Sequence, residues 1–321
     1  MILTNTKISK GIAMRITILL DYRSQFYSST RSRGAALNTD LLCREFTAKG
    51  YQVEVKHFVE INFRREDYKG VVILYQSSED PSLKYKDYIE DVLLGLCFQG
   101  AVLVPDFMKF RAHHNKVFME ILRDVQGGQV CESIQSETYG TFEEFLRFHA
   151  SKIFPVVMKS AEGSKSIGTM LIRNWEKGVR VARKLSITPS LANARLILRH
   201  LWDRRGYVPL SNHRRKFVVQ NFIGGFSGDY KVLVYDKKYF VLFRKNRPND
   251  FRASGSGRIT FPDQVPQRVL NCAEQVFAQF NVPFASLDIG DDGERCHVLE
   301  FQFVTFGQYA VERSTHFFSK I

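Results

Sequence analysis

The stretch Val157–Met170, VMKSAEGSKSIGTM, places two glycines, three serines and two lysines between apolar residues. Its GSKSIGT segment has the G-x-x-x-x-G spacing of a Walker A phosphate loop, but Thr169 stands where that motif requires lysine. The segment leads into TMLI (169–172), which predicts a strand, so no helix N-terminus is offered to a phosphate. With FPVVMK (154–159) as the other strand, two interpretations remain open. One is a structural polar hairpin, and the other is a loop whose amides, serines and Lys165 bind an anion.

The composition is that of a globular protein with anionic partners. The chain has 321 residues, 44% of them apolar, which is enough for about two or three core-forming units. No apolar run approaches the roughly 20 residues that cross a bilayer, so we expect no membrane span. Five widely spaced cysteines without a C-x-x-C motif argue against disulfides and a zinc site and favour a cytoplasmic location. The formal net charge of +13 favours anionic partners, which are nucleotides, nucleic acid, acidic glycans or a membrane surface, without choosing among them.

Strands and helices alternate in the first third of the chain. Apolar or alternating runs and helical spacing predict these elements, in chain order RITILL (15–20), Thr39–Lys49, YQVEV (51–55), GVVILY (70–75), Lys86–Phe98 and AVLVP (101–105). Such alternation is typical of a small α/β unit with a largely parallel sheet. We therefore expect an N-terminal α/β domain over 14–108.

The remainder, 109–321, mixes helices with antiparallel strands. In HNKVFMEILRD (114–124), helical spacing places Val117, Ile121 and Val125 on one apolar face. Further predicted features are a helix over Thr141–Ala150, a mostly helical and strongly basic segment 173–216, a hairpin YKVLVY–DKK–YFVLFR (230–244), a helix over Pro266–Phe280, and the strands FASLDI and RCHVLEFQF joined by GDDG.

The last of these strands carries an acid and an amide. In HVLEFQF (297–303), alternation places Val298, Glu300 and Gln302 on one face, opposite the face of His297, Leu299, Phe301 and Phe303. Polar groups inside a buried strand are costly unless they are paired or bind a cation. Both side chains offer oxygen ligands that suit Mg²⁺. A structural ion pair between Glu300 and an arginine is an equally weighted alternative.

Asp288, on the preceding strand, is a candidate third oxygen ligand. Antiparallel partners have a constant index sum, so Asp288 shares a face with Glu300 only if that sum is even. This requires an odd number of loop residues around GDDG, or a bulge.

Three further candidates are weaker. Arg252, in the polar segment DFRASGSGR (250–258), has the geometry to hold a phosphate in a bidentate manner. His113 and His114 are adjacent and point about 100° apart on a helix, so a surface role outweighs a metal pair. Cys131 has no partner that indicates a nucleophile, so a structural role outweighs a catalytic one.

The order of these motifs carries more information than any one of them. Lys116 precedes FPVVMKSAEGSKSIG, which is followed by FVVQNFIGGFSGDYKVLVY, FRASGSG, LDIG and VLEFQ. This succession resembles the ATP-grasp superfamily, which includes D-alanine–D-alanine ligases, glutathione synthetases and ribosomal-protein glutamate ligases. The resemblance covers roughly 106–307 and implies an α/β (α+β) ATP-grasp fold over 109–321, preceded by an α/β pre-ATP-grasp domain. It implies a central lobe over about 112–220 and a C-terminal lobe over about 221–321.

The resemblance also implies site roles for individual residues, with ATP and Mg²⁺ as cofactors. Arg252 and Lys159 match catalytic residues, and Arg252 would steady the transferred phosphoryl group. The residues that would bind ATP are Lys116, Lys159, Gly163, Ser164, Lys165, Ser166, Gly168, Gln220, Asn221, Phe222, Ile223, Asp229 and Lys231. Asp288, Glu300 and Gln302 would bind the metal. Segment 163–168 would fold over the triphosphate as a mobile lid.

Two departures from the family pattern stand out. The family commonly has Glu-x-Asn at the last metal position, whereas this chain has Glu300–Phe301–Gln302. The tail TFGQYAVERSTHFF lacks the Ser-Pro-Gly turn that is frequent after that asparagine. The family's acceptor specificities therefore do not transfer to this chain.

Two functions from different classes follow. The first is an ATP-dependent carboxylate–amine ligase that acts through an acyl phosphate on a small-molecule or acidic-polymer substrate, such as an amino acid, a peptide or a uronic-acid sugar. The second is a basic protein on the same scaffold that binds nucleic acid or an acidic polymer through segment 173–216 without ligation, and it is the less favoured of the two. The resemblance also implies a homodimer.

Overall fold

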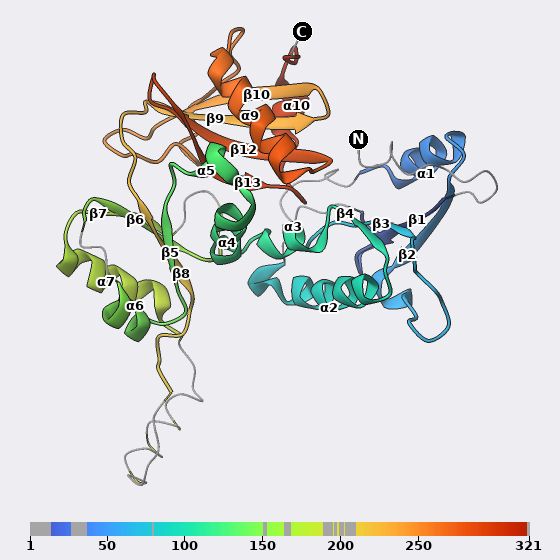
Figure 1. Cartoon of the computed structure of the whole chain (residues 1–321), viewed down its shortest axis with the longest axis horizontal. Coiled ribbons are helices and arrows are strands. Elements are labelled where there is room, and N and C mark those ends of the chain that lie inside the picture. The colour runs from blue at the N-terminus through green and yellow to red at the C-terminus, as the bar shows by residue number, and fades with distance from the viewer. Residues whose placement is uncertain are drawn as a thin grey trace.

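The described residues form three β-sheets, linked by helices. The structure is a computed structural model that describes residues 14–26, 37–78, 80–149, 153–163, 168–188 and 210–319, together with residues 195, 198 and 202. Figure 1 shows the N-terminal sheet on one side of the molecule and the other two sheets on the opposite side, with α3 and α4 between them. An α+β architecture is therefore present, as predicted.

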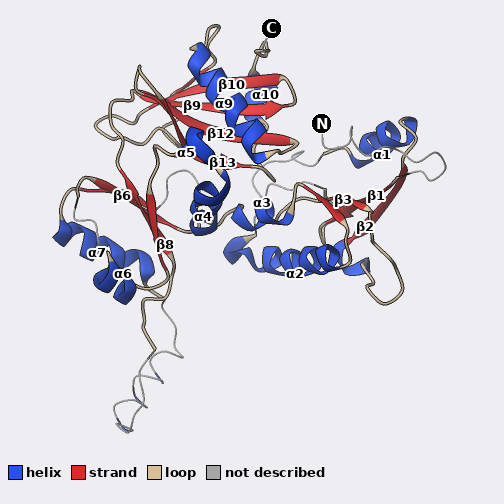
Figure 2. Ribbon diagram, viewed as in Figure 1, coloured by secondary structure: helices blue, strands red, loops and turns tan. Residues whose placement is uncertain are grey.

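The N-terminal sheet is parallel throughout. Its strand order is β2-β1-β3-β4, and each neighbouring pair runs parallel. The elements are β1 (Arg15–Leu20), α1 (Thr39–Ala48), β2 (Gln52–His57), η1 (Phe58–Glu60), β3 (Val72–Leu74), η2 (Pro81–Leu83), α2 (Lys84–Phe98) and β4 (Val102–Val104). The predicted strands and helices of this unit are confirmed in type and order (Figure 2).

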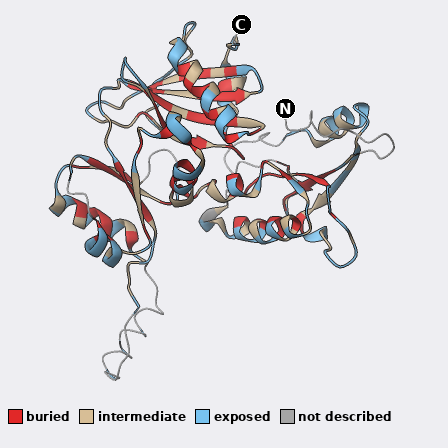
Figure 3. Ribbon diagram, in the orientation of Figure 1, coloured by how far each residue is buried: buried red, intermediate tan, exposed pale blue. Residues whose placement is uncertain are grey.

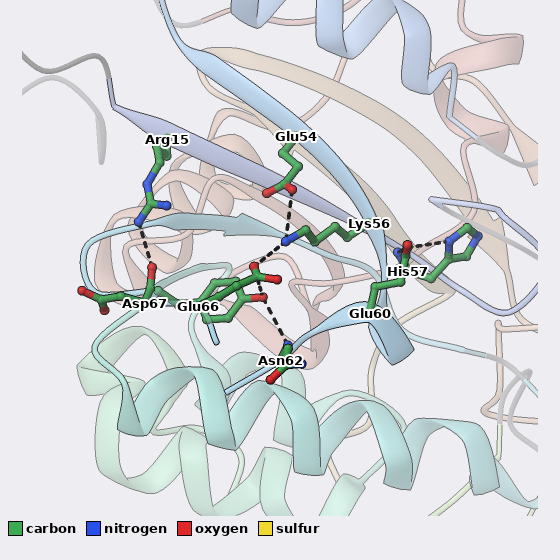
Figure 4. Close-up of polar contacts among 9 residues, drawn as sticks. Arg15, Glu54, Lys56, His57, Glu60, Asn62, Glu66 and Asp67 are labelled. Atoms are coloured by element: carbon green, nitrogen blue, oxygen red, sulfur yellow. Dashed lines mark hydrogen bonds and ion pairs between the residues drawn. The ribbon is translucent and has the colours of Figure 1, made fainter. Parts of the chain in front are cut away.

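Polar contacts connect the loop before β3 to strands β1 and β2 (Figure 4). Lys56 on β2 pairs with Glu54, Nζ to Oε1 at 3.0 Å, and with Glu66 in that loop. Arg15 on β1 donates to the carbonyl oxygen of Asp67 at 2.8 Å. The loop is therefore fixed to both β1 and β2.

The central sheet is antiparallel and has the order β5-β8-β6-β7. Helices α6 and α7 pack on it around Phe145, Met158 and Val181. The elements of this region are α3 (Phe107–Ala112), α4 (Lys116–Gln126), α5 (Gly128–Cys131), β5 (Ser136–Tyr139), α6 (Phe142–Phe148), β6 (Val156–Ser160), β7 (Thr169–Ile172), α7 (Trp175–Ser186) and β8 (Phe217–Asn221). β6 and β7 are the two strands predicted on either side of the loop over 163–168.

The C-terminal sheet is also antiparallel, with the order β11-β10-β9-β12-β13. Helix α9 covers one of its faces through Val269, Ala273 and Val276. Figure 3 shows how burial concentrates in these strands. The elements are β9 (Gly228–Tyr235), β10 (Lys238–Lys245), β11 (Ile259–Thr260), α9 (Gln267–Phe280), β12 (Phe284–Asp291), β13 (Cys296–Gln302) and α10 (Tyr309–Arg313).

Helix α4 packs on the C-terminal sheet with a face that the sequence did not indicate. Met119 and Leu122 join the core of that sheet. Ile121 and Val125 are 42% and 75% exposed, so the apolar face predicted from Val117, Ile121 and Val125 is wrong. The buried face also carries charged residues, which a hydrophobic pattern cannot identify.

None of the helices in the described part of the chain combines the length and the apolar character needed to cross a bilayer.

Strands β9 and β10 approach so closely at Gly228 that a side chain does not fit. A Cβ at this position would lie 2.2 Å from the carbonyl oxygen of Arg244. We expect Gly228→Ala to lower the free energy of unfolding in urea by about 1–3 kcal/mol, because the two backbones must separate. In Gly307→Ala, the added Cβ meets no atom within 4 Å, and the change should stay below about 0.5 kcal/mol. Equal effects of the two substitutions would contradict this account.

Candidate functional site

A cavity of about 1150 Å³ lies between the central and C-terminal sheets, and the N-terminal unit also contributes to its wall. β6 and β8 line one side, and β9, β10, β12 and β13 line the other. Asp80, Ser82 and Leu83, just before α2, line it from the N-terminal unit. The central sheet, the C-terminal sheet and the segment before α2 thus meet at one site.

Most of the predicted site residues lie in the wall of this cavity. They are Lys116, Lys159, Gly163, Gln220, Asn221, Phe222, Ile223, Asp229, Lys231, Arg252, Asp288, Glu300 and Gln302. Ser164, Lys165 and Ser166 lie outside the described residues. Gly168 is described but is not among the residues of the wall.

The two predicted phosphate lysines come from different elements. Lys116 is the first residue of α4, which Asn115 caps, and its Nζ donates to the carbonyl oxygen of Gly163 at 2.7 Å. Lys159 is on β6 and faces the cavity. Burial lowers the pKa of the Lys159 ammonium, whereas the nearby carboxylates of Glu120 and Glu300 favour its charged form.

The glycines around the predicted loop adopt a backbone conformation that other residues rarely take. Gly163 has φ 116° and Gly168 has φ 75°. A Cβ at Gly168 would lie 2.4 Å from Oγ of Ser160, so the return into β7 requires glycine. Gly168 continues into a strand, which confirms that the stretch is not a Walker A loop.

The predicted adenine hinge begins at the end of β8. Gln220 is 3% exposed, and its amide Nε2 has no hydrogen-bond partner within the described residues. Asn221 is engaged instead in the fold, since its Oδ1 accepts from the main-chain N–H of Gln135 and its Nδ2 donates to the carbonyl oxygen of Ser133. Of these two side chains, Gln220 is therefore the one that retains a buried donor for a ligand.

A charge network crosses three adjacent strands on the floor of the cavity. Arg244 on β10 donates to both carboxylate oxygens of Asp229 on β9, at 2.7 and 2.8 Å. Its Nη2 also lies 2.7 Å from Oδ2 of Asp288 on β12. Lys231 on β9 lies 3.2 Å from Oδ1 of the same Asp288. Each oxygen of Asp288 thus has a cationic partner.

In this network the pKa values of the Asp229 and Asp288 carboxyls shift in opposite directions. Burial raises the pKa of the Asp229 carboxyl to about 6. Burial also opposes the ionisation of Asp288, but Arg244 and Lys231 outweigh it and hold the pKa of that carboxyl well below its usual range. Asp288 is therefore ionised at any physiological pH.

Asp288 and Glu300 lie directly opposite each other because β13 contains a bulge. Asp288 pairs with Glu300, whereas the next residue, Ile289, pairs with Val298. Leu299 is the extra residue, so the bulge supplies the even index sum that a shared face requires. The sequence-based condition for Asp288 and Glu300 to share a face is met.

The bulge also corrects the predicted faces of β13. Val298 is buried in the core with Phe301 and Phe303, on the side opposite to Glu300 and Gln302. Strict alternation had placed Val298 beside Glu300 and Leu299 with the two phenylalanines. Alternation holds on each side of Leu299 but does not hold across it.

Arg252 reaches the start of β7. Its guanidinium holds Asp250, with Nη2 2.6 Å from Oδ2, and its Nη1 donates to the carbonyl oxygen of Thr169 at 3.3 Å. Phe251 meets Phe222 of the hinge edge to face, with ring centroids 5.7 Å apart. The Arg252 loop therefore spans from the C-terminal sheet to the central sheet beside the cavity.

The donor set fits a nucleotide and a divalent cation. The unpartnered Gln220 amide is at the hinge, and Ser286 carries a second buried polar atom without a hydrogen-bond partner in the described chain. No described residue donates a hydrogen bond to the Glu300 carboxylate, and Glu300 and Gln302 both offer oxygens that suit Mg²⁺. Asp288 fits less well, because a metal there must share its oxygens with Arg244 and Lys231.

No group of three or more His, Cys, Asp or Glu side chains in the described residues is arranged to hold a metal ion. A metal at this site would therefore depend on the amide oxygen of Gln302, on water or on a ligand in addition to the carboxylates.

Two of the remaining weaker candidates, His113 and Cys131, are buried. His113 is 2% exposed, so the surface role expected for it is wrong, and its ring meets that of His114 edge to face at 4.2 Å. Cys131 is buried, and burial raises the pKa of its thiol, which supports the expected structural role.

Sequence reasoning missed Arg244 and the contribution of 80–83. The hairpin was predicted with the turn DKK, but the structure pairs Tyr235 with Lys238, so the turn is the dipeptide Asp236–Lys237. That one-residue difference in register places Arg244 opposite Asp229. A register based on a two-residue turn would have revealed the pair, whereas no local signal marks 80–83.

Comparisons with known proteins identify the fold. No protein-family model and no curated protein matches the sequence. The structure resembles D-alanine–D-alanine ligase from Bacillus anthracis, with 13% identity, a TM-score of 0.50, and coverage of 91% of this chain and 87% of that chain. It resembles D-cycloserine synthetase DcsG with 14% identity, a TM-score of 0.50, and coverage of 92% and 96%. A RimK domain protein ATP-grasp from Sphaerobacter thermophilus matches with 14% identity, a TM-score of 0.48, and coverage of 93% and 94%. The chain has the ATP-grasp fold.

The charge network makes the stability of the site depend on Arg244. We expect Arg244→Met to lower the free energy of unfolding by about 3–5 kcal/mol, because two buried carboxylates lose their shared partner. Denaturation in urea with fluorescence detection measures the change. Arg268→Met is the control, since the pair between Arg268 and Asp291 has a side-chain exposure of 45% at the arginine, and it should have a far smaller effect. A wild-type-like Arg244→Met protein would contradict the proposed dependence.

Proposed function

We propose that this protein is an ATP-dependent carboxylate–amine ligase that uses Mg²⁺ and forms an acyl phosphate. The observation that carries the proposal is the convergence of cationic and metal-binding candidates from six separate sequence segments on one cavity of about 1150 Å³. The ATP-grasp fold supports it at the level of architecture. The division into an α/β domain over 14–108 and a two-lobed domain over 109–321 belongs to the same proposal.

In this proposal the nucleotide lies between the central and C-terminal sheets. Gln220 would donate its free amide to the base, because that amide is buried and has no partner in the described chain. Lys116 would contact the phosphates from α4 and Lys159 from β6. Lys116 already donates to the Gly163 carbonyl, so it would exchange that bond for a phosphate or share it.

The chemistry follows from charge neutralisation and positioning. ATP, when bound, supplies the phosphoryl group that converts an unreactive carboxylate into an acyl phosphate, which an amine can attack. Arg252 and Lys159 would stabilise the charge that develops on the transferred group. Glu300 and Gln302 would hold Mg²⁺ through their oxygens. Phe222 and Phe251 line the cavity beside Arg252 and reduce the local dielectric, which strengthens these interactions.

The substrate would enter from the side of the N-terminal unit. Asp80 and Ser82 of that unit line the cavity. Lys231 and Arg244 lie on the cavity floor but are already paired with Asp229 and Asp288. Arg252 and the metal would therefore be the groups that neutralise the carboxylate of the acidic substrate.

The ligase proposal predicts the loss of turnover in two variants. Arg252→Ala and Glu300→Ala should remain folded but release no ADP, because neither side chain belongs to the core and both would stabilise the reacting phosphates. The measurement is ADP release during a screen of amino acids, short acidic peptides and acidic sugars with the wild-type protein and the two variants.

Matched controls exist for both positions. Arg258→Ala removes an arginine from the same loop as Arg252, and Glu294→Ala removes an exposed acid from the turn before β13. Both should keep wild-type turnover. ADP release at the wild-type rate by Arg252→Ala and Glu300→Ala would overturn the mechanism.

A basic stripe on α7 favours an acidic polymer as the substrate. The stripe consists of Lys177, Arg180 and Lys184, which are exposed and follow helical spacing, and Arg173 precedes it. Arg173 and Lys177 line a smaller cavity of about 480 Å³ whose wall also includes Arg252. A chain held on this stripe would thus lead towards the residue proposed to act on the phosphoryl group. The same stripe supports the alternative of a nucleic-acid-binding protein without ligase activity.

Binding of labelled probes separates the two alternatives. We expect a fluorescent oligoglutamate to bind, and Lys177→Ala/Arg180→Ala/Lys184→Ala to weaken it by roughly tenfold, because three cations are lost. Lys49→Ala/Lys69→Ala/Lys237→Ala removes the same charge from other exposed sites and should change little. Preferential binding of single-stranded DNA would favour the alternative, with affinity that falls roughly 50-fold from 50 to 200 mM salt for four phosphate contacts.

A further inference from the structure

A buried ion pair on α4 contacts the strand that carries Glu300. Glu120 and Arg123 lie one turn apart, and each side chain is 1% exposed. Nε of Arg123 donates to Oε2 of Glu120 at 2.9 Å. The remaining guanidinium nitrogens point to β13, where Nη1 donates to the carbonyl oxygen of Val298 at 2.7 Å and Nη2 to that of Leu299 at 3.4 Å.

These two carbonyls flank the bulge. β13 is the last strand of its sheet, so one of its edges has no neighbouring strand among the described residues. Leu299 is the residue that the bulge leaves without a partner on β12. Arg123 therefore supplies donors at the place where the strand ladder leaves acceptors unsatisfied.

The bulge decides which way Glu300 faces. From Ile289 to Asp291 the paired residues of β12 and β13 have an index sum of 587, and at Asp288 the sum becomes 588. If the first register continued, Glu300 would lie opposite Leu287, whose side chain is fully buried in the core. A carboxylate in that position would lose the cavity and enter an apolar environment.

The guanidinium is suited to hold this geometry. Its Cζ lies 5.3 Å from the centre of the Phe301 ring, the first core residue after the bulge. A planar guanidinium donates to Glu120 and to two carbonyls at once, which a lysine ammonium does not reproduce in the same plane. Burial and four hydrogen bonds leave the side chain little freedom.

We propose that Arg123, held in place by Glu120, is a positioning residue that fixes the β13 bulge and thereby directs the Glu300 carboxylate into the cavity. The geometric part of this inference concerns Glu300 alone. Its consequence for the affinity of a divalent cation rests on the proposed function.

The first experiment measures the direction of residue 300 without any ligand. Glu300→Cys is combined with wild-type Arg123, with Arg123→Met and with Leu122→Ala, and the labelling rate by N-ethylmaleimide at position 300 is followed by peptide mass spectrometry. Leu122→Ala truncates a core residue of the same helix and controls for general loosening. We expect Arg123→Met to reduce the labelling rate by about tenfold, because the thiol turns into the core, and Leu122→Ala to leave it unchanged or faster.

The second experiment measures the cation site. Affinity of Mn²⁺ for the complex with a non-hydrolysable ATP analogue is determined by electron paramagnetic resonance for wild type, Arg123→Met, Arg123→Lys and Leu122→Ala. We expect a loss of about 10–100-fold in Arg123→Met, which is the usual effect of removing a partner that orients a metal ligand. Arg123→Lys should give a smaller loss, and Leu122→Ala should bind as wild type does.

The outcomes are distinguishable. Labelling at position 300 that stays at the wild-type rate in Arg123→Met overturns the positioning role, whatever the metal result. If Arg123→Met does not fold, labelling in the Arg123→Lys background answers the same question, with a reduced rate expected. Reduced labelling together with no Mn²⁺ binding in the wild type supports the positioning role and contradicts the proposed function.

Discussion

The floor of the cavity depends on the neutralisation of Asp229 and Asp288 by Arg244. These residues lie on adjacent strands of the C-terminal sheet, and each carboxylate would be costly to bury alone. Lys231 completes a group of two acids and two bases. Because this group is balanced within the protein, the neighbouring Glu300 is the carboxylate that retains its oxygens for a ligand. The site thus combines a paired floor with Glu300, whose carboxylate accepts no hydrogen bond from the described residues.

Helix α4 connects the two sides of this site. Its first residue, Lys116, holds the carbonyl of Gly163 at the start of the loop after β6. Two turns later, Arg123 holds the β13 bulge. Both side chains lie on the buried face of the helix, which also packs on the C-terminal sheet through Met119 and Leu122. A rigid helix therefore relates the position of a proposed phosphate contact to that of a proposed metal ligand.

Element types were largely predictable, whereas register was not. The parallel N-terminal strands and helix α9 follow from local hydrophobic patterns, and the structure confirms them. The β9–β10 hairpin was also predicted, but with a turn one residue too long, and this hid the pair of Arg244 with Asp229. The sequence also did not predict that Arg123 is buried and Val125 exposed. An apolar pattern cannot identify a buried ion pair.

The sequence by itself determined the order of the motifs, from Lys116 through the Gly163–Gly168 segment and Arg252 to Glu300, and this order was sufficient to indicate the ATP-grasp fold. Local residue types carry such information because the residues of each strand, turn and helix favour the local conformation that the fold requires. Only the tertiary structure decided that Glu300 faces the cavity with Asp288 opposite it. That outcome depends on one extra residue in β13, Leu299. It also depends on the guanidinium of Arg123 in α4, which bonds to Val298, 175 residues later in the chain. Since a one-residue shift reverses every side chain of a strand, the contact that holds the bulge determines the chemistry of the site.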